Sequence, residues 1–408
     1  MMDARPHDSE VSAGWGRILV IYLLCVLAAS SISQVVPIVG DIARFFHVPG
    51  QQVGWIISIP SALVAVGALL TGWAVDRVGD KPLLLLGTVL LIVGDLGVTL
   101  AQSTHVMLGM RVVEGVGYDL VAVSTVTMIA RVTAGRRRTA ALTLWSSFVP
   151  MSFVIPLLLA SLLAGTGHWR WAFGGHALAL AALGLLALGL PGRPAGGVAA
   201  GRSAGLAAVL KTPACYALGV AFACAAFVQT GIVSTLPQML EARYGLSVGA
   251  ASGVGTLGML CNIAGCLLMG PLLNRGLPRL GLALGSVLLT AVAGVALFAP
   301  GLPLGAAVVL ALVFFLGAGL VVGLWALLPG VAPAPVSRGA TSGLVTQLTL
   351  WGVLFGPPAA FAAQAHTGAS GREMVNILVA LALCALTLWM VVHRAGARLE
   401  RGAAPAVH

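Results

Sequence analysis

The sequence contains few charged side chains. Asp, Glu, Lys and Arg make up 8% of its 408 residues, whereas an ordinary soluble domain holds roughly a quarter. Apolar residues make up 59% of the chain, so there is too little charge to cover the surface of a soluble protein of this size. The composition therefore excludes an ordinary soluble fold and favours a polytopic α-helical membrane protein.

Cysteine patterns and catalytic motifs are also scarce. The six cysteines all fall within apolar runs, without the spacing of a disulfide framework or a zinc site. The sequence has no HExxH motif and no glycine-rich phosphate loop that ends in Lys-Ser or Lys-Thr, and its eight histidines are scattered. We therefore expect neither enzyme activity nor a bound metal or cofactor, and the missing nucleotide loop argues against ATP-driven transport.

Apolar runs that are long enough to cross a bilayer as helices recur along the chain. We predict an all-α integral membrane fold with twelve spans, at 18–39, 51–74, 82–101, 106–130, 139–164, 172–190, 213–237, 248–273, 281–299, 304–330, 340–364 and 373–393. A cleaved signal peptide is the competing interpretation of the first run, because VLAASS resembles a small-residue cleavage site. The acidic residues Asp3, Asp8 and Glu10 in the leader favour an uncleaved span instead.

The basic residues are distributed unevenly between the predicted loops. Of the 22 Lys and Arg residues, 17 lie in the termini and in alternate loops, Arg111 lies inside a span, and the opposite loops hold only Arg44, Arg170, Arg243 and Arg372. Because basic loops stay in the cytoplasm, we predict a multi-pass protein of the inner membrane with both termini cytoplasmic. This distribution accounts for the net charge of +10 without a nucleic-acid partner.

The two halves of the chain resemble each other at an offset near 200 residues. PIVGDIARFF at Pro37 matches PQMLEARYG at Pro237, and GWAVDRVGDK at Gly72 matches GPLLNRGLPR at Gly270. Two glycine pairs match at an offset of 202: Gly115 with Gly317, and Gly117 with Gly319. We predict two pseudo-symmetric six-helix halves, 1–190 and 212–408, which are joined by a cytoplasmic linker at 191–211. This is the plan of a transporter with its site at the midplane between the halves.

The stretch GWAVDRVGDKP resembles the signature loop of the major facilitator superfamily, which joins spans two and three. The family pattern is Gly-x-x-x-Asp-Arg-x-Gly followed by basic residues. Five residues fit it: Gly72, Asp76, Arg77, Gly79 and Lys81. Asp80 departs from it, because the family usually has a basic residue there. The resemblance implies a loop that latches the two halves together on the cytoplasmic side.

RVVEGVGYDL in span four resembles a second signature of the family, Arg-x-x-Gln-Gly-x-Gly, with Glu114 in the position of Gln. WRWAF at 169–173 is similar to the usual extracytoplasmic end of span five. Together with the two similar halves, the resemblance covers the whole chain. It implies the family's twelve-helix fold of two halves. In proton-coupled members the Arg of this signature, here Arg111, is tied to the coupling machinery.

Spans three and four carry four ionisable side chains: Asp95, Arg111, Glu114 and Asp119. Asp95 and Arg111 fall at a similar depth on consecutive helices, so we expect them to pair, because an unpaired charge in hydrocarbon is costly. Arg111 and Glu114 are three residues apart and share a helix face. The set is interpreted either as a static packing network or as a proton-binding site. Asp119, which has no basic residue nearby in sequence, is the better candidate for the proton carrier.

Spans seven to twelve contain no clearly intramembrane Asp, Glu, Lys or Arg. The family resemblance implies a central cavity, and the polar and aromatic residues placed to line it are Gln34, Trp145, Gln229, Asn262, Trp325, Gln347 and Trp351. Such a lining suits a small solute that is mostly apolar or weakly acidic, because a sugar or a polyanion needs more donors and acceptors.

We therefore predict a secondary active transporter of such a solute, coupled to protons, which works by alternating access. Uptake and efflux both stay open. The alternative is a proton-antiport efflux pump, although antiporters of this family carry Gly-Pro-x-x-Gly-Gly in span five, where this chain has Ile155, Pro156, Leu159 and Ala160 in a run without glycine. A non-transporting membrane sensor is a lesser alternative. The expected partners are the small-molecule substrate, protons and the lipid bilayer, and we expect a monomer.

Overall fold

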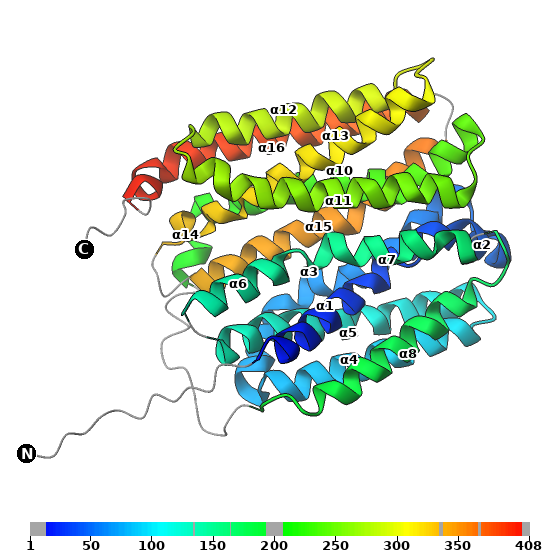
Figure 1. Ribbon diagram of the computed structural model, residues 1–408, viewed down its shortest axis with the longest axis horizontal. Helices are drawn as coiled ribbons and strands as arrows, with labels where there is room; N and C mark the ends of the chain where they lie inside the picture. The colour runs from blue at the N-terminus through cyan, green and yellow to red at the C-terminus, as the bar shows by residue number, and fades with distance from the viewer. Residues whose placement is uncertain are drawn as a thin grey trace, which may run out of the picture.

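The computed structural model describes residues 14–133, 135–163, 165–192, 207–333, 338–365 and 369–401. Within these ranges every regular element is an α-helix or a 3₁₀ helix (Figure 1). Ten helices are long and apolar enough to cross a membrane, and the shorter apolar helices Val53–Ala68 and Phe148–Leu159 supply the two other predicted spans. The predicted all-α fold of twelve membrane helices is confirmed.

The first half of the chain contributes ten of the named elements. They are α1 (Trp15–Ser33), η1 (Val36–Ile38), α2 (Val39–Phe46), η2 (Gly50–Gln52), α3 (Val53–Val78), α4 (Asp80–Leu100), α5 (Thr104–Val132), α6 (Gly135–Ser146), α7 (Phe148–Leu163) and α8 (Arg170–Ala187). The second half contributes α10 (Pro213–Tyr244), α11 (Val248–Asn274), α12 (Arg279–Leu297), α13 (Leu304–Gly323), η3 (Leu324–Leu327), α14 (Leu328–Val331), α15 (Arg338–Gln364) and α16 (Ala369–Arg401).

Three of the predicted spans are interrupted rather than continuous. Span one ends as an α-helix at Ser33 and continues through η1 into α2, span five divides into α6 and α7, and span ten ends as η3 and α14. A proline stands in the first turn of a new segment in each case: Pro37 in η1, Pro150 in α7 and Pro329 in α14. Proline lacks the N–H that would continue the preceding helix but fits a first turn.

The two halves pack their helices in the same way. In the first half α4 contacts both α5 and α8, and α3 contacts α5. In the second half α12 contacts both α13 and α16, and α11 contacts α13. Figure 1 shows the two groups of helices side by side, which is the predicted pseudo-symmetry. The boundary at residue 190 and the linker at 191–211 stay a prediction, and 193–206 lie outside the described residues.

Close contacts at glycines fix the register between the halves. A Cβ at Gly94 on α4 would collide with Glu114 on α5, and a Cβ at Gly294 on α12 would lie in tight contact with Phe314 on α13, 3.1 Å from Cδ2. The positions 94 and 294, like 114 and 314, differ by 200. The offset of 202 that was predicted for the glycines of spans four and ten is therefore wrong.

Gly117 faces α4, where an added Cβ would lie 2.7 Å from Gly87 O. Gly317 faces the equivalent helix α12, where an added Cβ would lie 2.6 Å from Thr290 Oγ1. Gly117 and Gly317 are therefore the equivalent pair. Each helix has two glycines spaced two residues apart, Gly115 and Gly117 on α5 and Gly317 and Gly319 on α13. An alignment shifted by two residues therefore still matches glycine with glycine.

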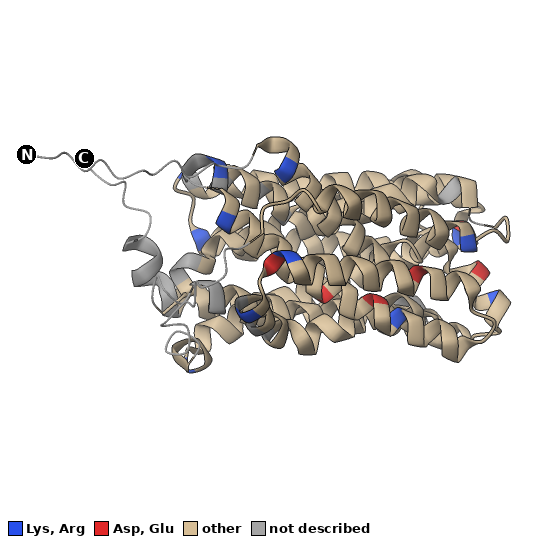
Figure 2. Cartoon of the chain, turned by 90° about the horizontal axis from the view of Figure 1, so that it is seen from below, with Lys and Arg blue, Asp and Glu red and all other residues tan. Residues whose placement is uncertain are grey.

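The two ends of the helix bundle differ in charge. Figure 1 shows the start of α1 and the end of α16 at the same end of the bundle, which we call the basic end. Most of the Lys and Arg residues in Figure 2 gather near it, and several acidic residues lie part-way along the bundle. We call the opposite end, where α2 and η2 lie, the distal end.

The two halves touch each other closely at the distal end. Gly54 at the start of α3 lies so near the backbone of Pro358 on α15 that no side chain would fit between them. Gln238 Nε2 on α10 donates a hydrogen bond to Val36 O in η1 at 3.1 Å. The Trp55 and Phe355 rings meet edge to face, with centroids 6.1 Å apart. These contacts join α3 to α15 and η1 to α10 across the boundary between the halves.

Candidate functional site

Arg111 is fully buried on α5 and is held from three directions. Its Nη1 donates to Glu114 Oε2 one turn along the same helix, its Nε donates to Ile56 O on α3 at 3.0 Å, and its Nη2 donates to Ile57 O at 3.5 Å. The charge of Arg111 is therefore compensated within its own helix and solvated by the backbone of α3.

Pro60 explains why α3 can offer a carbonyl to Arg111. In an α-helix Ile56 O would accept from the N–H of the residue four positions later, but residue 60 is a proline inside α3 and has no N–H. Arg111 Nε supplies the missing donor. Gly115 makes the approach possible, because a Cβ there would lie 2.7 Å from Pro60 O. The pairing of Pro60 with Arg111 thus satisfies two groups that would otherwise be unpaired in hydrocarbon.

Asp95 forms a second cluster with α8 and α1. His176 Nδ1 on α8 lies 2.7 Å from Asp95 Oδ2, and His176 Nε2 lies 2.8 Å from Leu27 O on α1. Gln34 Nε2, at the C-cap of α1, donates to Asp95 Oδ1 at 3.1 Å. Asp95, His176 and Gln34 are all buried. Asp95 therefore joins three helices, α1, α4 and α8.

The predicted ion pair between Asp95 and Arg111 is wrong. Among the described residues, Asp95 pairs with His176 and Arg111 pairs with Glu114. Gly94 is the residue of α4 that faces Glu114, and the next residue points about 100° further around the helix. Asp95 is therefore turned from α5 toward α1 and α8. Asp95 and Arg111 lie at a similar depth along the sequence of their spans, but Asp95 projects from a side of α4 that does not face α5.

His176 is the functional candidate that the sequence analysis missed. It lies on the sixth predicted span, in the run FGGHALAL, and it is the partner of Asp95. A lone histidine in an apolar run has no spacing pattern that would reveal a partner 81 positions away. The available signal was its position inside a span, because ionisable residues within membrane helices are rare and usually functional.

Asp119 lies apart from both clusters, between α5 and α3. Thr71 Oγ1 donates to Asp119 Oδ2 at 2.5 Å, while Asp119 Oδ1 is buried without a hydrogen-bond partner. Among the described residues no cation forms an ion pair with it. Glu114 Oε1 is likewise buried without a partner. An oxygen of this kind can carry a proton as a carboxylic acid or accept a hydrogen bond from a ligand.

The loop that resembles the family's latch forms contacts within the first half. Gly79 joins α3 to α4 with φ of 103°, a conformation that favours glycine. Lys81 Nζ donates to Leu188 O and Leu190 O just beyond α8, both at 2.7 Å. Arg77 is exposed, and an added Cβ at Gly72 would meet open space. The side chain of Asp76 lies outside the described part of the structure.

The seven candidates for the cavity lie in different surroundings. Gln34 is bound to Asp95, and Asn262 is buried on α11, where its Nδ2 donates to Phe315 O on α13 at 3.1 Å. Asn262 therefore holds two helices of one half together. Trp145 Nε1 donates to Thr125 Oγ1 at 3.1 Å, and the Trp325 ring lies 5.0 Å from that of Phe222.

The other three candidates keep free polar or aromatic surface. Trp351 is exposed and stacks on Phe355, with ring centroids 5.8 Å apart. Gln229 is half-buried on α10, and Gln347 Oε1 on α15 is buried without a hydrogen-bond partner. Phe355 also contacts Trp55 of the first half. The aromatic run from Trp351 through Phe355 to Trp55 therefore crosses the boundary between the halves.

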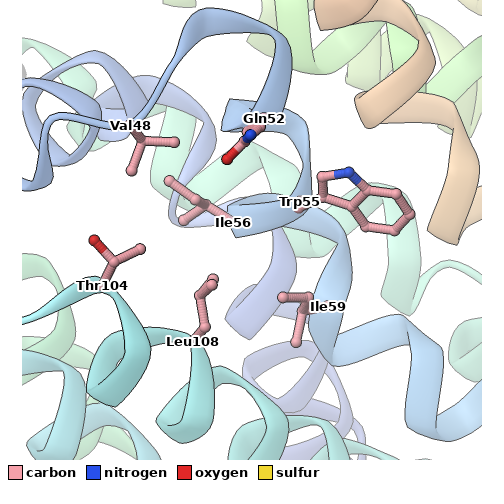
Figure 3. A pocket seen from close by; sticks show the side chains of 7 residues that line it. All are labelled: Val48, Gln52, Trp55, Ile56, Ile59, Thr104 and Leu108. Carbon is pink, nitrogen blue, oxygen red and sulfur yellow. The ribbon is translucent and has the colours of Figure 1, made fainter.

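A pocket of about 320 Å³ lies at the distal end between α3 and α5. Its lining consists of Val48, Gln52, Trp55, Ile56, Ile59, Thr104 and Leu108. Figure 3 shows Thr104 and Leu108 from α5 across the pocket from Ile56 and Ile59 of α3. This lining includes none of the seven candidates for the central cavity, so the pocket is a separate feature of the first half.

Most of the chain matches one protein family. The family model of the Major Facilitator Superfamily matches residues 18–357. The chain belongs to this superfamily. The resemblance that was inferred from the two signature stretches is thereby confirmed.

Curated relatives match this chain over part of their length. The arabinose-proton symporter of Escherichia coli K12 is 26% identical over 140 residues, which are 34% of this chain and 30% of the symporter. Protein TsgA of Salmonella arizonae is 27% identical over 236 residues, which are 56% of this chain and 55% of that protein. The chain thus spans between about a fifth and about a half of the length of the curated relatives that it matches.

Solved structures of other superfamily members match nearly the whole chain. A bacterial homologue of the human lysosomal transporter Spinster, in an inward-facing and unoccupied conformation, has a TM-score of 0.72 and 17% sequence identity and covers 95% of this chain and 97% of its own. The proton:xylose symporter XylE has a TM-score of 0.71 and 14% identity, covering 92% and 95%. At this identity the likeness supports the shared fold.

Proposed function

We propose that this chain is a proton-coupled secondary transporter of a small organic solute that is mostly apolar or weakly acidic. The supporting observation is that a group of four buried ionisable residues, Asp95, Arg111, Glu114 and Asp119, lies in the first half. The second half also buries a carboxylate, Glu373, but near the start of α16. The offset of 200 pairs each with an uncharged residue of the other half: Asp95 with Val295, Arg111 with Ala311, Glu114 with Phe314 and Asp119 with Gly319. Because both halves build the same helix packing, the packing itself does not require these charges.

The Glu114 position illustrates this asymmetry. Glu114 packs against Gly94, and Phe314 packs against Gly294 in the equivalent place. A buried carboxylate in a membrane costs far more than a phenyl ring, so its retention needs a reason other than helix packing. Proton binding is the chemistry that this carboxylate, with Oε1 unpartnered, can perform.

Asp119 is the proposed proton carrier. Its carboxyl group receives a single hydrogen bond, from Thr71, and faces Gly67 on α3, where an added Cβ would lie 2.9 Å from Oδ2. Without a cation beside it among the described residues, the negative charge would be compensated by Thr71 alone. A proton on the unpartnered oxygen removes that charge. Binding and release of the proton would therefore change the net charge at the contact between α3 and α5.

The named relatives support proton coupling and symport. Two relatives from Escherichia coli are named as proton symporters: the arabinose-proton symporter, and the galactose-proton symporter, which is 23% identical over 133 residues. The three glycines of the antiporter stretch are missing from span five, which favours symport over an efflux antiporter. We propose that the basic end faces the cytoplasm and that the halves rock about the solute as a monomer.

The test is transport by the purified protein in proteoliposomes with an imposed pH gradient. A panel of pentoses, hexoses, small aromatic compounds and weak organic acids would be offered, with a pH-sensitive dye trapped inside the vesicles. The expected result is that one class of solute moves together with protons. Asp119→Asn should abolish accumulation driven by the gradient while leaving exchange of solute at equal pH.

Glu241→Gln is the matched control, because Glu241 is an exposed carboxylate at the distal end of α10. It should accumulate solute like the unaltered protein. Solute movement that is independent of the pH gradient in every case would overturn proton coupling, and full accumulation by Asp119→Asn would remove Asp119 from the proton path.

A further inference from the structure

The hydrogen bonds of His176 fix where its protons are. A backbone carbonyl only accepts hydrogen bonds, so Nε2, which lies 2.8 Å from Leu27 O, must carry a proton. Asp95 Oδ2 lies 2.7 Å from the other ring nitrogen, Nδ1. A contact of this length between two acceptors is repulsive, so one further proton has to lie between Asp95 and His176. This assignment follows from the partners of the ring.

The shared proton can be drawn in two ways with the same total charge. Either an imidazolium faces a carboxylate, or a neutral imidazole accepts from a carboxylic acid. In both forms the pair is neutral, which suits a buried site in a membrane helix bundle. Loss of the proton leaves an anion at Asp95 that faces the lone pair of Nδ1, so the contact between α4 and α8 would become repulsive.

The neighbouring charged groups of the pair lie on α5, and its neighbours on α1 are uncharged. Glu114 on α5 lies close enough to interact electrostatically with both members, and it is paired with Arg111. From α1 the pair receives only uncharged groups, Leu27 O and the Gln34 amide. The Glu114–Arg111 pair is neutral as a unit, so the added proton of Asp95 and His176 decides whether this region holds a net negative charge.

Gln34 connects this proton to the contact between the halves. Its amide donates to Asp95 Oδ1, and it is the C-cap residue at the end of α1. Two residues later Val36 O accepts from Gln238 of the second half, at the distal end. Gln34 and Val36 flank the turn from α1 into η1, so displacement of the Gln34 side chain acts on the segment that bears the contact with α10.

We propose that Asp95 and His176 form a binding site for one proton, and that this proton stabilises the distal contact between Val36 and Gln238. Protonation then favours the arrangement in which the halves touch at the distal end, and loss of the proton favours their separation there. This inference rests on the proposed function, because it assigns a second proton site, distinct from Asp119, to the same transporter. It makes His176 a positioning residue for the conformational change.

The test measures the distance between the halves as a function of pH. Spin labels would be attached at Gly40→Cys and Ala242→Cys, exposed positions one helical turn beyond Val36 and Gln238, in a chain whose six native cysteines are replaced. The imidazole group changes its charge between about pH 5 and pH 8 in ordinary surroundings, so distances would be recorded from about pH 5 to about pH 9. We expect a short distance in acid and a longer one in alkali.

Asp95→Asn should remove this response. The amide Nδ2 can donate to a neutral Nδ1, and the amide oxygen can still accept from Gln34, so the variant imitates the protonated pair without being able to lose the proton. We expect the short distance at every pH. His168→Gln, which removes an exposed histidine just before α8, should keep the shift of the unaltered protein.

Two results would overturn the inference: a distance in the unaltered protein that does not change with pH, or a change that persists in Asp95→Asn. If Asp95→Asn does not fold, the ¹⁵N resonances of His176 in the unaltered protein take its place, and they must show loss of a ring proton over the range in which the distance changes. Because the distance is measured without solute or gradient, its failure is distinguishable from a failure of proton-driven accumulation.

Discussion

Arg131 at the end of α5 binds Asp80 at the start of α4 with two parallel hydrogen bonds. Arg131 Nε donates to Asp80 Oδ2 at 2.7 Å, and Nη2 donates to Oδ1 at 2.8 Å. Nη2 also donates to Pro191 O at 2.9 Å, just beyond α8. Asp80 is the residue that departs from the family's loop pattern. Here it lies at a helix N-terminus, where a carboxylate is favourable, and the pair ties three helices together at the basic end.

Asp80→Ala should therefore lower the thermal stability of the protein. A hydrogen bond to a charged group contributes about 1.5–3 kcal/mol, and the Asp80 carboxylate is buried while Arg131 is partly exposed. Arg131→Ala should cost a similar amount, and the double variant should cost less than the sum. Thermal unfolding in detergent measures this coupling. Arg275→Ala is the control, because it removes an exposed arginine at the C-terminal end of α11. Strict additivity would show that the pair contributes nothing.

Arg111→Ala should be among the most damaging single changes in this chain. It leaves Glu114 buried and unpaired, and breaking a buried pair in this way typically costs about 3–5 kcal/mol. Arg111→Ala combined with Glu114→Phe imitates Ala311 and Phe314 of the second half, so the double variant should recover stability but not proton-coupled transport. A thermal-stability cycle checks the first part and a vesicle assay the second. Coupling of Arg111 to Asp95 that exceeded its coupling to Glu114 would contradict this structure.

Gly54→Ala should weaken the distal contact between the halves. Its Cβ would collide with the backbone of Pro358, and a backbone cannot move aside cheaply. The distance between labels at Gly40→Cys and Ala242→Cys should therefore lengthen even in acid. Gly253→Ala near the start of α11 is the control, because an added Cβ there meets open space. Equal distances in the two variants would mean that the α3–α15 contact does not hold the halves together.

Asp76→Asn should impair transport more than it impairs abundance in the membrane. Asp76 matches the acidic position of the family's loop signature, and the resemblance assigns that loop to one of the two conformational states. Transport rates are compared at equal amounts of protein, as judged by quantitative blotting. Rates equal to those of the unaltered protein would show that this carboxylate is dispensable here.

A reporter enzyme fused after His408 should be active only in the cytoplasm. The start of α1 and the end of α16 lie at the same end of the bundle (Figure 1), and Lys and Arg gather near that end (Figure 2). Basic loops are retained in the cytoplasm, so both termini should face it. Periplasmic activity of the fusion would reverse the orientation of the whole bundle.

The sequence predicted the helices well because each span is a long apolar run. The limits of α5, Thr104–Val132, differ by two residues at each end from the predicted 106–130. The interruption between α6 and α7 at Ser147 was not predicted, because apolar residues continue on both sides of Pro150. Length and hydropathy detect a run that can cross a membrane, but they do not detect where its backbone hydrogen bonds are broken.

The buried ionisable residues were predicted better than their partners. Asp95, Arg111 and Glu114 are all fully buried, and charge in an apolar run was enough to single them out. Their pairing depends on which way each helix is turned, and α8, which brings His176, has no pattern in sequence that shows its rotation. Gln34 is predicted to line the solute cavity, and its hydrogen bond to Asp95 could not be predicted from the sequence.

The order in which the chain is made gives the Asp95–His176 contact a further consequence. His176 follows Asp95 by 81 residues, and at about 5–20 residues per second the ribosome needs roughly 4–16 s to add them. Span three therefore enters the membrane before His176, which shares a proton with Asp95, has been made. During that time the nascent helix must keep Asp95 in contact with water or with the insertion machinery. Chains that stop before α8 should be recognised as unfinished and degraded, whereas chains that stop after Ala187 already contain every partner of this carboxylate.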